Sequence, residues 1–365
     1  MIPLFKIHTP DNIGQKLQEV FDSGFLTEGE YSDKFEKSLA NYIGNENVCL
    51  VNSCTSALLL ASHLCEIGPG DEVITTAMTC MATNEPFFNA GAKLVFADID
   101  PKTGNIDPND VRRKITSKTK AIVVVHWAGQ PVDLKAINDI ASANGIRVIE
   151  DAAHALGAKY ESHRIGNHSD FVCFSFQAIK HLTTADGGAI VCRDKADADR
   201  IRKLRWYGLD RKYSERTGKS RWEQDIQESG FKLHMNNLNA AIGLEQMKSI
   251  DFIINSHIEN GKYYDKNINN KKVKKLERTD GCFSSYWIYS VLVENKEEFK
   301  NYMKENGIAT DVVHIRNDTY SVFEDFRSDE LKNLEYFESR LINIPVGWWL
   351  TEEERRHIVG VVNEY

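Results

Sequence analysis

The stretch DFVCFSFQAIKHLTTADGGAI, residues 170–190, holds the lysine around which the rest of the chain is interpreted. An apolar run typical of a buried strand ends at Phe176, and Lys180 follows it ahead of two threonines, an aspartate and two glycines. A lysine that is desolvated beside a strand end has a lowered pKa, and its amine can attack a carbonyl carbon to form a Schiff base. Taken singly, a lysine is more often a surface charge, so the surrounding segments decide between the two interpretations.

Upstream of this stretch, strand and helix patterns alternate regularly. Short apolar runs predict strands at residues 47–52, 71–76, 93–99, 120–127 and 147–151. Helices are expected between them, beginning near Thr55, Met81, Pro108 and Leu134. Buried strands separated by helices imply a mostly parallel sheet that is covered on both faces.

The outer parts of the chain follow other patterns. Two amphipathic helices are expected at residues 11–24 and 31–44, and residues 196–230 are polar and appear rich in loops. From about residue 250 the pattern is that of a smaller α+β unit, whose last helix begins with the capping-box sequence TEEE. We therefore predict an α/β fold with a large domain over residues 1–248 and a small C-terminal domain over residues 249–365.

Composition excludes several classes of protein. The 365 residues are 42% hydrophobic and 27% charged, with a formal net charge of −8, which argues against a dedicated nucleic-acid binder. No apolar run approaches the roughly 18 residues that span a membrane, and the N-terminus lacks the features of a secretory signal. The seven cysteines form no C-x-x-C pair, so we expect no metal site, and a reducing cytoplasm is the simplest compartment.

Polar residues follow several of the predicted strands, at the sheet edge where ligands bind in open parallel sheets. Cys54 and Thr55 lie between a strand and an apolar helix, where free N–H groups and the helix dipole attract anions. The simpler interpretation of that turn is an ordinary helix cap. Asp151 ends another apolar strand, and it either caps a following helix or faces a cationic ring nitrogen.

These groups together match the needs of one coenzyme. An anion site, a carboxylate for a ring nitrogen, the serine Ser175 for a phosphate and a nucleophilic lysine are what pyridoxal 5′-phosphate requires. Seven motifs, in order, resemble the DegT/DnrJ/EryC1/StrS family of sugar aminotransferases, which have the type I fold of aspartate aminotransferase. The motifs are NSCTSAL (52–58), GDEVITTAMTCMATN (70–84), GAKLVFADIDPKTGNIDP (91–108), HWAGQP (126–131), VIEDAAHALGA (148–158), FSFQAIKHLTTADGGAI (174–190) and GFKLHMNNLNAAIGL (230–244).

The resemblance implies a role for each coenzyme contact. Lys180 would form the Schiff base, and Asp151 would pair with the pyridine nitrogen. His154 stands where the family often has a glutamine that contacts the 3′ oxygen of the ring. The phosphate would be held by Ser175 and by the segment of Cys54, through its backbone, and Thr55.

The resemblance also implies a homodimer with shared active sites, in which the segment GFKLHMNN reaches into the neighbouring subunit. Lys232 in this segment replaces the usual asparagine, and His234 replaces an arginine or lysine. As a point charge, Lys232 could still reach the phosphate. Cys80 replaces an aromatic residue that commonly stacks on the coenzyme ring, so another side chain would have to cover that face. Asp186 replaces the usual glutamate, which is a milder change.

The implied reaction moves an amino group from an amino acid, L-glutamate by family habit, to a keto-sugar that is most often linked to a nucleotide. Such reactions serve the biosynthesis of amino sugars and surface polysaccharides. A branch of the family with histidine in place of the lysine dehydrates sugars, and Lys180 places this chain on the transaminase side. Candidate substrate contacts are Thr27 in the loop GFLTEGE and His314, Arg316 and Tyr320 in VVHIRNDTYSVF. The second segment is equally consistent with a local turn.

Three other functions are weighed against this one. The acceptor could be a cyclitol or another keto-compound without a nucleotide. The protein could also bind pyridoxal phosphate without turnover and serve in regulation, given the changes at Cys80, Lys232 and His234. A dinucleotide-dependent oxidoreductase is disfavoured because no G-x-G-x-x-G follows the first strand.

Overall fold

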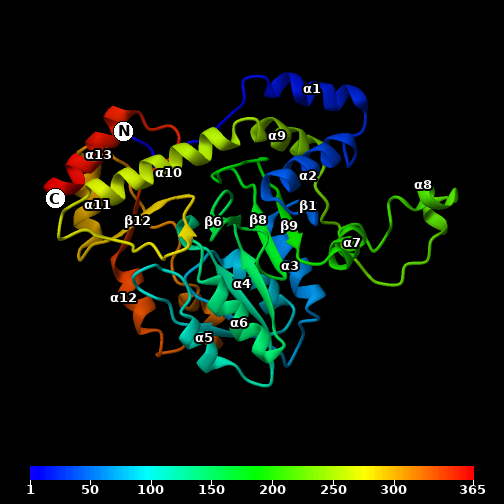
Figure 1. The fold of residues 1–365 in the computed structure, drawn as a ribbon, viewed down its shortest axis with the longest axis horizontal. Helices are drawn as coiled ribbons and strands as arrows, with labels where there is room; N and C mark the ends of the chain where they lie inside the picture. The colour runs from blue at the N-terminus through cyan, green and yellow to red at the C-terminus, as the bar shows by residue number, and fades with distance from the viewer.

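A seven-stranded sheet forms the centre of the computed structural model, which describes residues 1–365 (Figure 1). Its strands lie in the order β1-β9-β8-β5-β4-β2-β3. In chain order they are β1 (Val48–Val51), β2 (Glu72–Thr76), β3 (Lys93–Ala97), β4 (Thr119–Val125), β5 (Arg147–Asp151), β8 (Phe171–Ser175) and β9 (Gly188–Cys192). Only β9 runs antiparallel to its neighbours, and the predicted mostly parallel, mixed sheet of the type I fold is confirmed.

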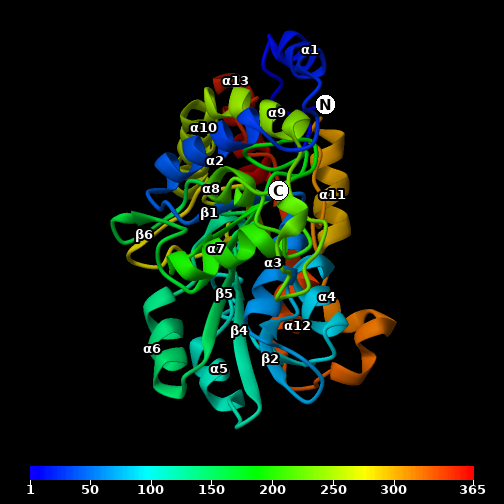
Figure 2. The ribbon, with the colours of Figure 1, turned by 90° about the vertical axis from the view of Figure 1, so that its right-hand side faces the viewer.

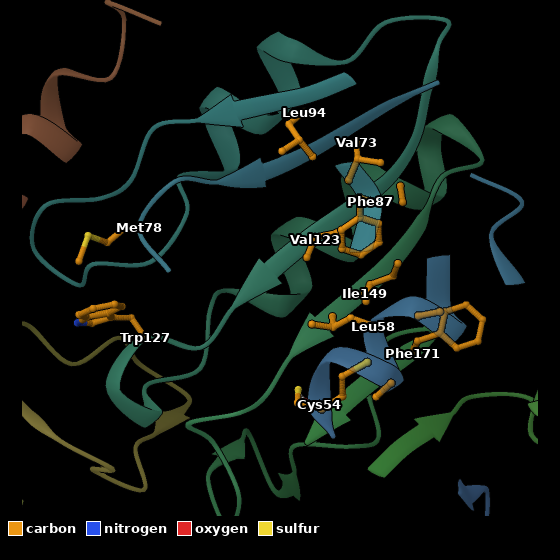
Figure 3. Close-up of a cluster of buried hydrophobic side chains, with 14 of the residues drawn as sticks. Cys54, Leu58, Val73, Met78, Phe87, Leu94, Val123, Trp127, Ile149 and Phe171 are labelled. Atoms are coloured by element: carbon orange, nitrogen blue, oxygen red, sulfur yellow. Dashed lines mark hydrogen bonds between the residues drawn. The ribbon is translucent and has the colours of Figure 1, made fainter. Parts of the chain in front are cut away.

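Successive side chains of each strand enter two separate apolar cores. In β4, Ala121 and Val123 belong to one core, whereas Ile122 and Val124 belong to the other. Because strand side chains alternate between faces, a sheet buried on both sides requires the continuous apolar runs that the sequence contains. Figure 3 shows part of the first core, with Val123 and Phe171 among its labelled side chains.

Helices cover both faces of the sheet (Figure 2). The first core includes side chains of α3 (Cys54–Leu64), α4 (Met81–Asn89) and α7 (Lys195–Leu204). The second core includes side chains of α2 (Glu30–Ile43), α5 (Pro108–Lys114), α6 (Leu134–Asn144) and α9 (Asn237–Met247). The helix α1 (Ile13–Ser23) lies beside α9 (Figure 1). The sheet and these helices place the carboxyl ends of the parallel strands at one edge of the large domain.

The prediction that residues 196–230 are rich in loops was wrong at its start, where α7 forms. Ala198, Ile201 and Leu204 are buried at helical spacing in a segment that is otherwise charged. The remainder, residues 205–230, contains only α8 (Tyr213–Thr217) and a 3₁₀ turn (Arg221–Glu223). We call residues 205–230 the arm, because this segment extends away from the body of the molecule beyond α7 (Figure 1).

The C-terminal part of the chain forms its own small sheet, in the order β10-β12-β13. Its elements are α10 (Ile250–Asn267), β10 (Lys274–Lys275), β12 (Tyr289–Leu292), α11 (Lys296–Glu305), 3₁₀ turns (Asn317–Thr319 and Ser321–Phe326), α12 (Lys332–Arg340), β13 (Leu341–Ile344) and α13 (Glu352–Glu364). The sequence indicated neither α12 nor β13. The capping box is present at the start of α13, where the side chains of Thr351 and Glu354 each accept the backbone N–H of the other residue.

The two ends of the chain meet in this small domain. Ile2 donates its N–H to Gly307 O at 2.7 Å and accepts from Ala309 N at 2.9 Å, and its side chain joins the third apolar core. The expected boundary at residues 248 and 249 falls between α9 and α10 and stays a prediction. A third sheet consists of β11 (Cys282–Phe283), β6 (Lys159–Tyr160) and β7 (His163–Arg164), and it joins the two parts of the chain. None of the helices has the length and apolar character needed to cross a bilayer.

Candidate active site

A cavity of about 360 Å³ opens at the carboxyl ends of β5 and β8. Its walls come from the starts of α3 and α4, the loop between β8 and β9, and the segment before the Asn317–Thr319 turn. The lining includes the predicted site residues Cys54, Thr55, Cys80, Asp151, His154, Ser175, Lys180 and His314. Residues that are far apart in the sequence therefore meet in one concave site.

The start of α3 provides an anion-binding turn. The Ser53 hydroxyl caps the helix by accepting the Ser56 N–H at 3.0 Å. The N–H groups of Cys54 and Thr55 have no acceptor within the helix, because first-turn donors lack one. Gly188 in β9 passes so close that a Cβ there would lie 2.5 Å from the Ser53 carbonyl carbon. Glycine at this position allows the helix start to approach the sheet, so the cap and the anion site occur together.

Asp151 is the carboxylate that faces the cavity. Its Oδ2 accepts from the Thr83 hydroxyl at 2.6 Å, and its Oδ1 accepts from the Ala153 N–H at 3.0 Å. The side chain of Glu150 points to the other side of β5, where His126 lies 2.8 Å away. Turns rather than a helix follow Asp151, so the interpretation of Asp151 as a helix cap was wrong. The hydrogen bonds fix the carboxylate in a buried position.

Lys180 extends from the loop between β8 and β9 into the same cavity. Its Nζ lies 3.7 Å from the centroid of the Trp287 ring, and no hydrogen-bond partner holds it. Although the residue as a whole is half-buried, burial of the amine lowers its pKa to about 8, against the opposing effect of the Asp151 charge. About a tenth of the amine is therefore uncharged at pH 7, far more than for an ordinary lysine, and the uncharged form is the nucleophile.

Aromatic rings form a second side of the site, where His154 and His314 line the cavity and Trp287 packs against His154 outside the lining. His154 stacks on Trp287 with ring centroids 3.8 Å apart and an interplanar angle of 14°. The ring of His314 lies parallel to His154, with 3.4 Å between the two Nε2 atoms. Burial lowers the pKa of His154 far below its usual value and that of His314 to about 3, so both imidazoles are neutral. Lys180 is therefore the cationic side chain of the cavity lining.

Cys80 is exposed to the cavity at the start of α4. No phenylalanine, tyrosine or tryptophan belongs to the cavity lining, so the imidazoles of His154 and His314 are its flat side chains. Cys54, by contrast, is buried, and burial raises the pKa of its thiol well above the usual value. The Cys54 thiol donates to Asp151 Oδ1 at 3.9 Å, so Cys54 contributes to the site through its side chain as well as its backbone.

The residues present fit pyridoxal phosphate. The α3 turn and Ser175 offer donors to a phosphate, and the Asp151 carboxylate has acceptor capacity beyond the hydrogen bonds from Thr83, Ala153 and Cys54. His154 Nδ1 is buried and has no partner in the protein, which leaves one polar atom for a group in the cavity. The Lys180 amine completes the set that this coenzyme needs for attachment.

Four predicted contacts lie outside the lining of this cavity. Thr27 and Lys232 are exposed, and the Lys232 amine rests 3.6 Å from the centroid of the Trp206 ring. Arg316 makes a bidentate pair with the buried carboxylate of Asp318, at 2.7 and 2.6 Å. Tyr320 packs partly buried against the first core. Substrate roles for Thr27, Arg316 and Tyr320 stay predictions.

Several residues of the site escaped the sequence analysis. Thr83 was recognisable as a hydroxyl in the first turn of a helix that follows a parallel strand. Trp287 gave no signal, because its apolar segment indicated only a strand. Asn317 donates to Thr79 O at 2.7 Å and accepts from the buried Asn84 at 2.8 Å. The segment around Arg316 is therefore not a free local turn but is clamped to the loop before α4.

Comparison with known proteins agrees with this site. Residues 9–363 match the model of the DegT/DnrJ/EryC1/StrS aminotransferase family. The chain is 32% identical over 370 residues to GDP-perosamine synthase of Escherichia coli, covering 100% of this chain and 98% of that protein. It is 41% identical over 238 residues to the spore coat polysaccharide biosynthesis protein SpsC of Bacillus subtilis, which covers 65% of this chain and 61% of that protein.

Solved structures agree as well. The sugar aminotransferase CalS13 of Micromonospora echinospora superimposes with a TM-score of 0.94 at 36% identity, over 100% of both chains. The pyridoxal-phosphate form of Spr1654, a sugar aminotransferase candidate of Streptococcus pneumoniae, gives a TM-score of 0.89 at 26% identity, over 100% of this chain and 98% of that one. Fold and site thus define a pyridoxal-phosphate-dependent aminotransferase of the sugar aminotransferase class. The chain belongs to the DegT/DnrJ/EryC1/StrS aminotransferase family, as its motifs predicted.

Proposed function

We propose that this protein transfers an amino group from L-glutamate to a nucleotide-linked keto-sugar in the biosynthesis of an amino sugar or surface polysaccharide. The observation that carries the proposal is the Lys180 amine, which shares a cavity with the buried carboxylate Asp151. The names of the relatives, a GDP-perosamine synthase and a spore coat polysaccharide protein, support the substrate class. The seven cysteines are all free, which favours the cytoplasm as its location.

Lys180 has two tasks in this reaction. It provides the amine to which the coenzyme aldehyde attaches, and once displaced by the amino donor it moves a proton from the donor Cα. A pKa of about 8 lets the same Nζ accept that proton and release it again. Both halves of the reaction use Lys180, which explains why the cavity needs no separate pair of acid and base.

The other residues bind and orient. When bound, pyridoxal phosphate supplies an electron sink for the carbanion that forms at the substrate carbon. The Asp151 carboxylate, fixed by Thr83, keeps the ring nitrogen protonated and so maintains that sink. The turn of Cys54 and Thr55, together with Ser175, holds the phosphate.

We also propose a homodimer with shared active sites. A cavity of about 360 Å³ lies at the small end of ligand pockets, so the coenzyme occupies most of it and a nucleotide must bind outside it. The arm carries exposed aromatic and apolar side chains, Tyr207, Trp222 and Ile226, that suit an interface. Lys232, just after the arm, is the residue we assign to the phosphate of the partner's site.

The reaction is tested by incubating the protein, pyridoxal phosphate and L-glutamate with a panel of keto-compounds and weighing the products. Amination of a nucleotide-linked keto-sugar is expected. If only cyclitol ketones were aminated, the proposed nucleotide-linked sugar would be wrong and the proposed transamination would be right. Borohydride reduction should fix the coenzyme on the peptide that contains Lys180, and Lys180→Ala should fold, bind coenzyme reversibly and lose turnover at least about a hundredfold. The exposed Lys159→Ala serves as a control. An active Lys180→Ala would refute the assignment.

The shared site is tested with hybrid dimers of two inactive variants, Lys180→Ala and Lys232→Glu. If Lys232 serves the partner's site, one site of the hybrid combines an intact Lys180 with an intact Lys232. Each hybrid dimer should therefore have about half of the activity of an unmodified dimer, and an equal mixture after subunit exchange should recover about a quarter. If Lys232 served its own chain, no hybrid site would be complete and mixing would restore nothing.

A further inference from the structure

Trp287 contacts the catalytic loop in two ways. Its indole N–H donates to the carbonyl of Ile179, the residue before Lys180, at 2.9 Å. The face of the same indole lies 3.7 Å from the Lys180 Nζ, well within the range of a cation–π contact. Trp287 is 2% exposed and makes stacking contacts with His154 and with Phe5. One buried side chain thus contacts both the backbone of Ile179 and the amine of Lys180.

The backbone around Trp287 is fixed from both sides. Tyr286 has a φ of 48°, in the left-handed region that side-chain-bearing residues rarely occupy. The Tyr286 ring packs against Gly261, where a Cβ would lie 2.1 Å away, and its hydroxyl donates to Asp265 at 2.6 Å. On the other side, Ser285 N donates to Gly129 O at 3.1 Å. This strained turn directs Tyr286 into the small domain and Trp287 against His154 and Lys180 beside the cavity.

We propose that Trp287 is a positioning residue for Lys180, whose indole face receives the free amine whenever Lys180 is not attached to the coenzyme. This inference rests on the proposed role of Lys180 and deepens it. A transaminase lysine is released and reattached in each half-reaction, and a free amine needs a defined place from which it can move protons. The indole face binds the protonated amine through a cation–π contact and not through a hydrogen bond, so the amine can leave it easily. The hydrogen bond from the indole N–H to the Ile179 carbonyl keeps the indole face at a fixed position relative to the loop that carries Lys180.

Several other groups act on the amine, so the contribution of Trp287 must be separated from theirs. Asp151 favours the charged amine, whereas burial disfavours it. The remaining titratable groups around the amine are Cys54, Cys80, His154, His181 and His314. The three imidazoles are neutral because burial lowers the pKa of each. Burial lowers the pKa of the Lys180 amine. The Trp287 face stabilises the protonated amine against this effect without carrying a charge itself.

The test measures the pKa of the Lys180 amine in the coenzyme-free protein. Trace acetylation with acetic anhydride at a series of pH values, with mass spectrometry of the Lys180 peptide, gives this pKa directly. Trp287→Leu removes the aromatic face and should lower the pKa of the amine by about 0.5 to 1.5 units. Trp287→Phe keeps a ring but loses the N–H, so the pKa should stay near that of the unmodified protein. In the loaded enzyme, Trp287→Phe should lower kcat up to about tenfold with little change in the KM for the amino donor.

The matched control is Trp127→Phe. Trp127 is also 2% exposed and also approaches His154, but its indole N–H donates to Ser290 and the lysine amine lies over Trp287 instead. Trp127→Phe should leave the pKa of Lys180 unchanged. An unchanged or raised pKa in Trp287→Leu, or an equal fall in the control, would overturn the inference. Because the pKa is measured without coenzyme, this failure is distinct from a failure of the borohydride test, which would refute the role of Lys180 itself.

Discussion

The two walls of the cavity are built from different materials. The wall at the strand ends is formed by Asp151, which Thr83 holds from behind, and by the start of α3, and hydrogen bonds of 2.6 to 3.0 Å fix their polar groups. The second, aromatic wall is formed by the neutral imidazoles of His154 and His314, with Trp287 stacked on His154 outside the lining. The first wall supplies charge at defined points, and the second excludes water and charge from the lysine. With this division, the strand-end wall controls the charge of the coenzyme ring, and the aromatic wall controls the pKa of the Lys180 amine.

The largest effect is expected from removing the charge of the strand-end wall. Asp151→Asn keeps the shape but cannot hold a proton on the ring nitrogen, so turnover should fall about a hundredfold or more. Thr83→Val keeps the charge and removes one hydrogen bond, so its loss should stay within about tenfold. Steady-state kinetics with saturating coenzyme measure both. Equal losses for the two variants would mean that the carboxylate acts through its position and not through its charge.

The neutral wall predicts acid sensitivity. It continues behind Lys180 to His257, where burial lowers the pKa to about 4 from a usual value of 6.5. Between pH 6.5 and about 4 the imidazole is protonated in the unfolded chain but not in the native protein. The free energy of unfolding therefore decreases as the pH falls through this range. His257→Gln should flatten the dependence of unfolding free energy on pH, by at most about 3 kcal/mol. Urea unfolding at a series of pH values measures it. The exposed His163→Gln should leave the slope unchanged, and a slope in His257→Gln equal to that of the unmodified protein would contradict the prediction.

Asn317 joins the two walls, because it comes from the small-domain side and bonds to Asn84 and Thr79 on the other. Asn317→Ala leaves the buried Asn84 amide short of a partner and should lower the free energy of unfolding by about 1 to 3 kcal/mol. Denaturant unfolding measures this. Asn333→Ala is the control, since Asn333 is exposed and its side chain makes no hydrogen bond. A loss of the same size in both variants would show that the bridge between the walls contributes nothing specific.

The smallest effect concerns Cys80, at the edge of the two walls. Cys80→Phe supplies a flat side chain where the lining offers only imidazoles, and it should tighten coenzyme binding by about three- to tenfold. Titration of the coenzyme-free protein with pyridoxal phosphate, followed by absorbance, measures the affinity. Cys80→Ser controls for removal of the thiol. Weaker binding by Cys80→Phe would mean that the imidazoles already cover the ring and leave no room.

The strand-end wall was predictable from the sequence, whereas the aromatic wall was largely not. Local patterns place Asp151, Thr55 and Ser175 at strand ends, and parallel strands bring such ends together whatever else the chain does. Trp287 reaches the site through tertiary packing and a strained turn at Tyr286, neither of which leaves a periodic signal. The same distinction applies to the fold. The central strands were found because they are continuously apolar, but α7 and α12 are charged helices that show few apolar positions.

The pairing of Ile2 with residues 307–309 has a consequence for biosynthesis of the chain. Ile2 is synthesised about 300 residues before its partners, so the small domain cannot close until those later residues have been made. The same holds for Phe5, which stacks on Trp287. The large domain, whose strands are complete by Cys192, is free to form first. The aromatic wall is therefore completed late. A nascent chain that stalls before residue 287 would contain Lys180 but not the Trp287 ring that packs against it.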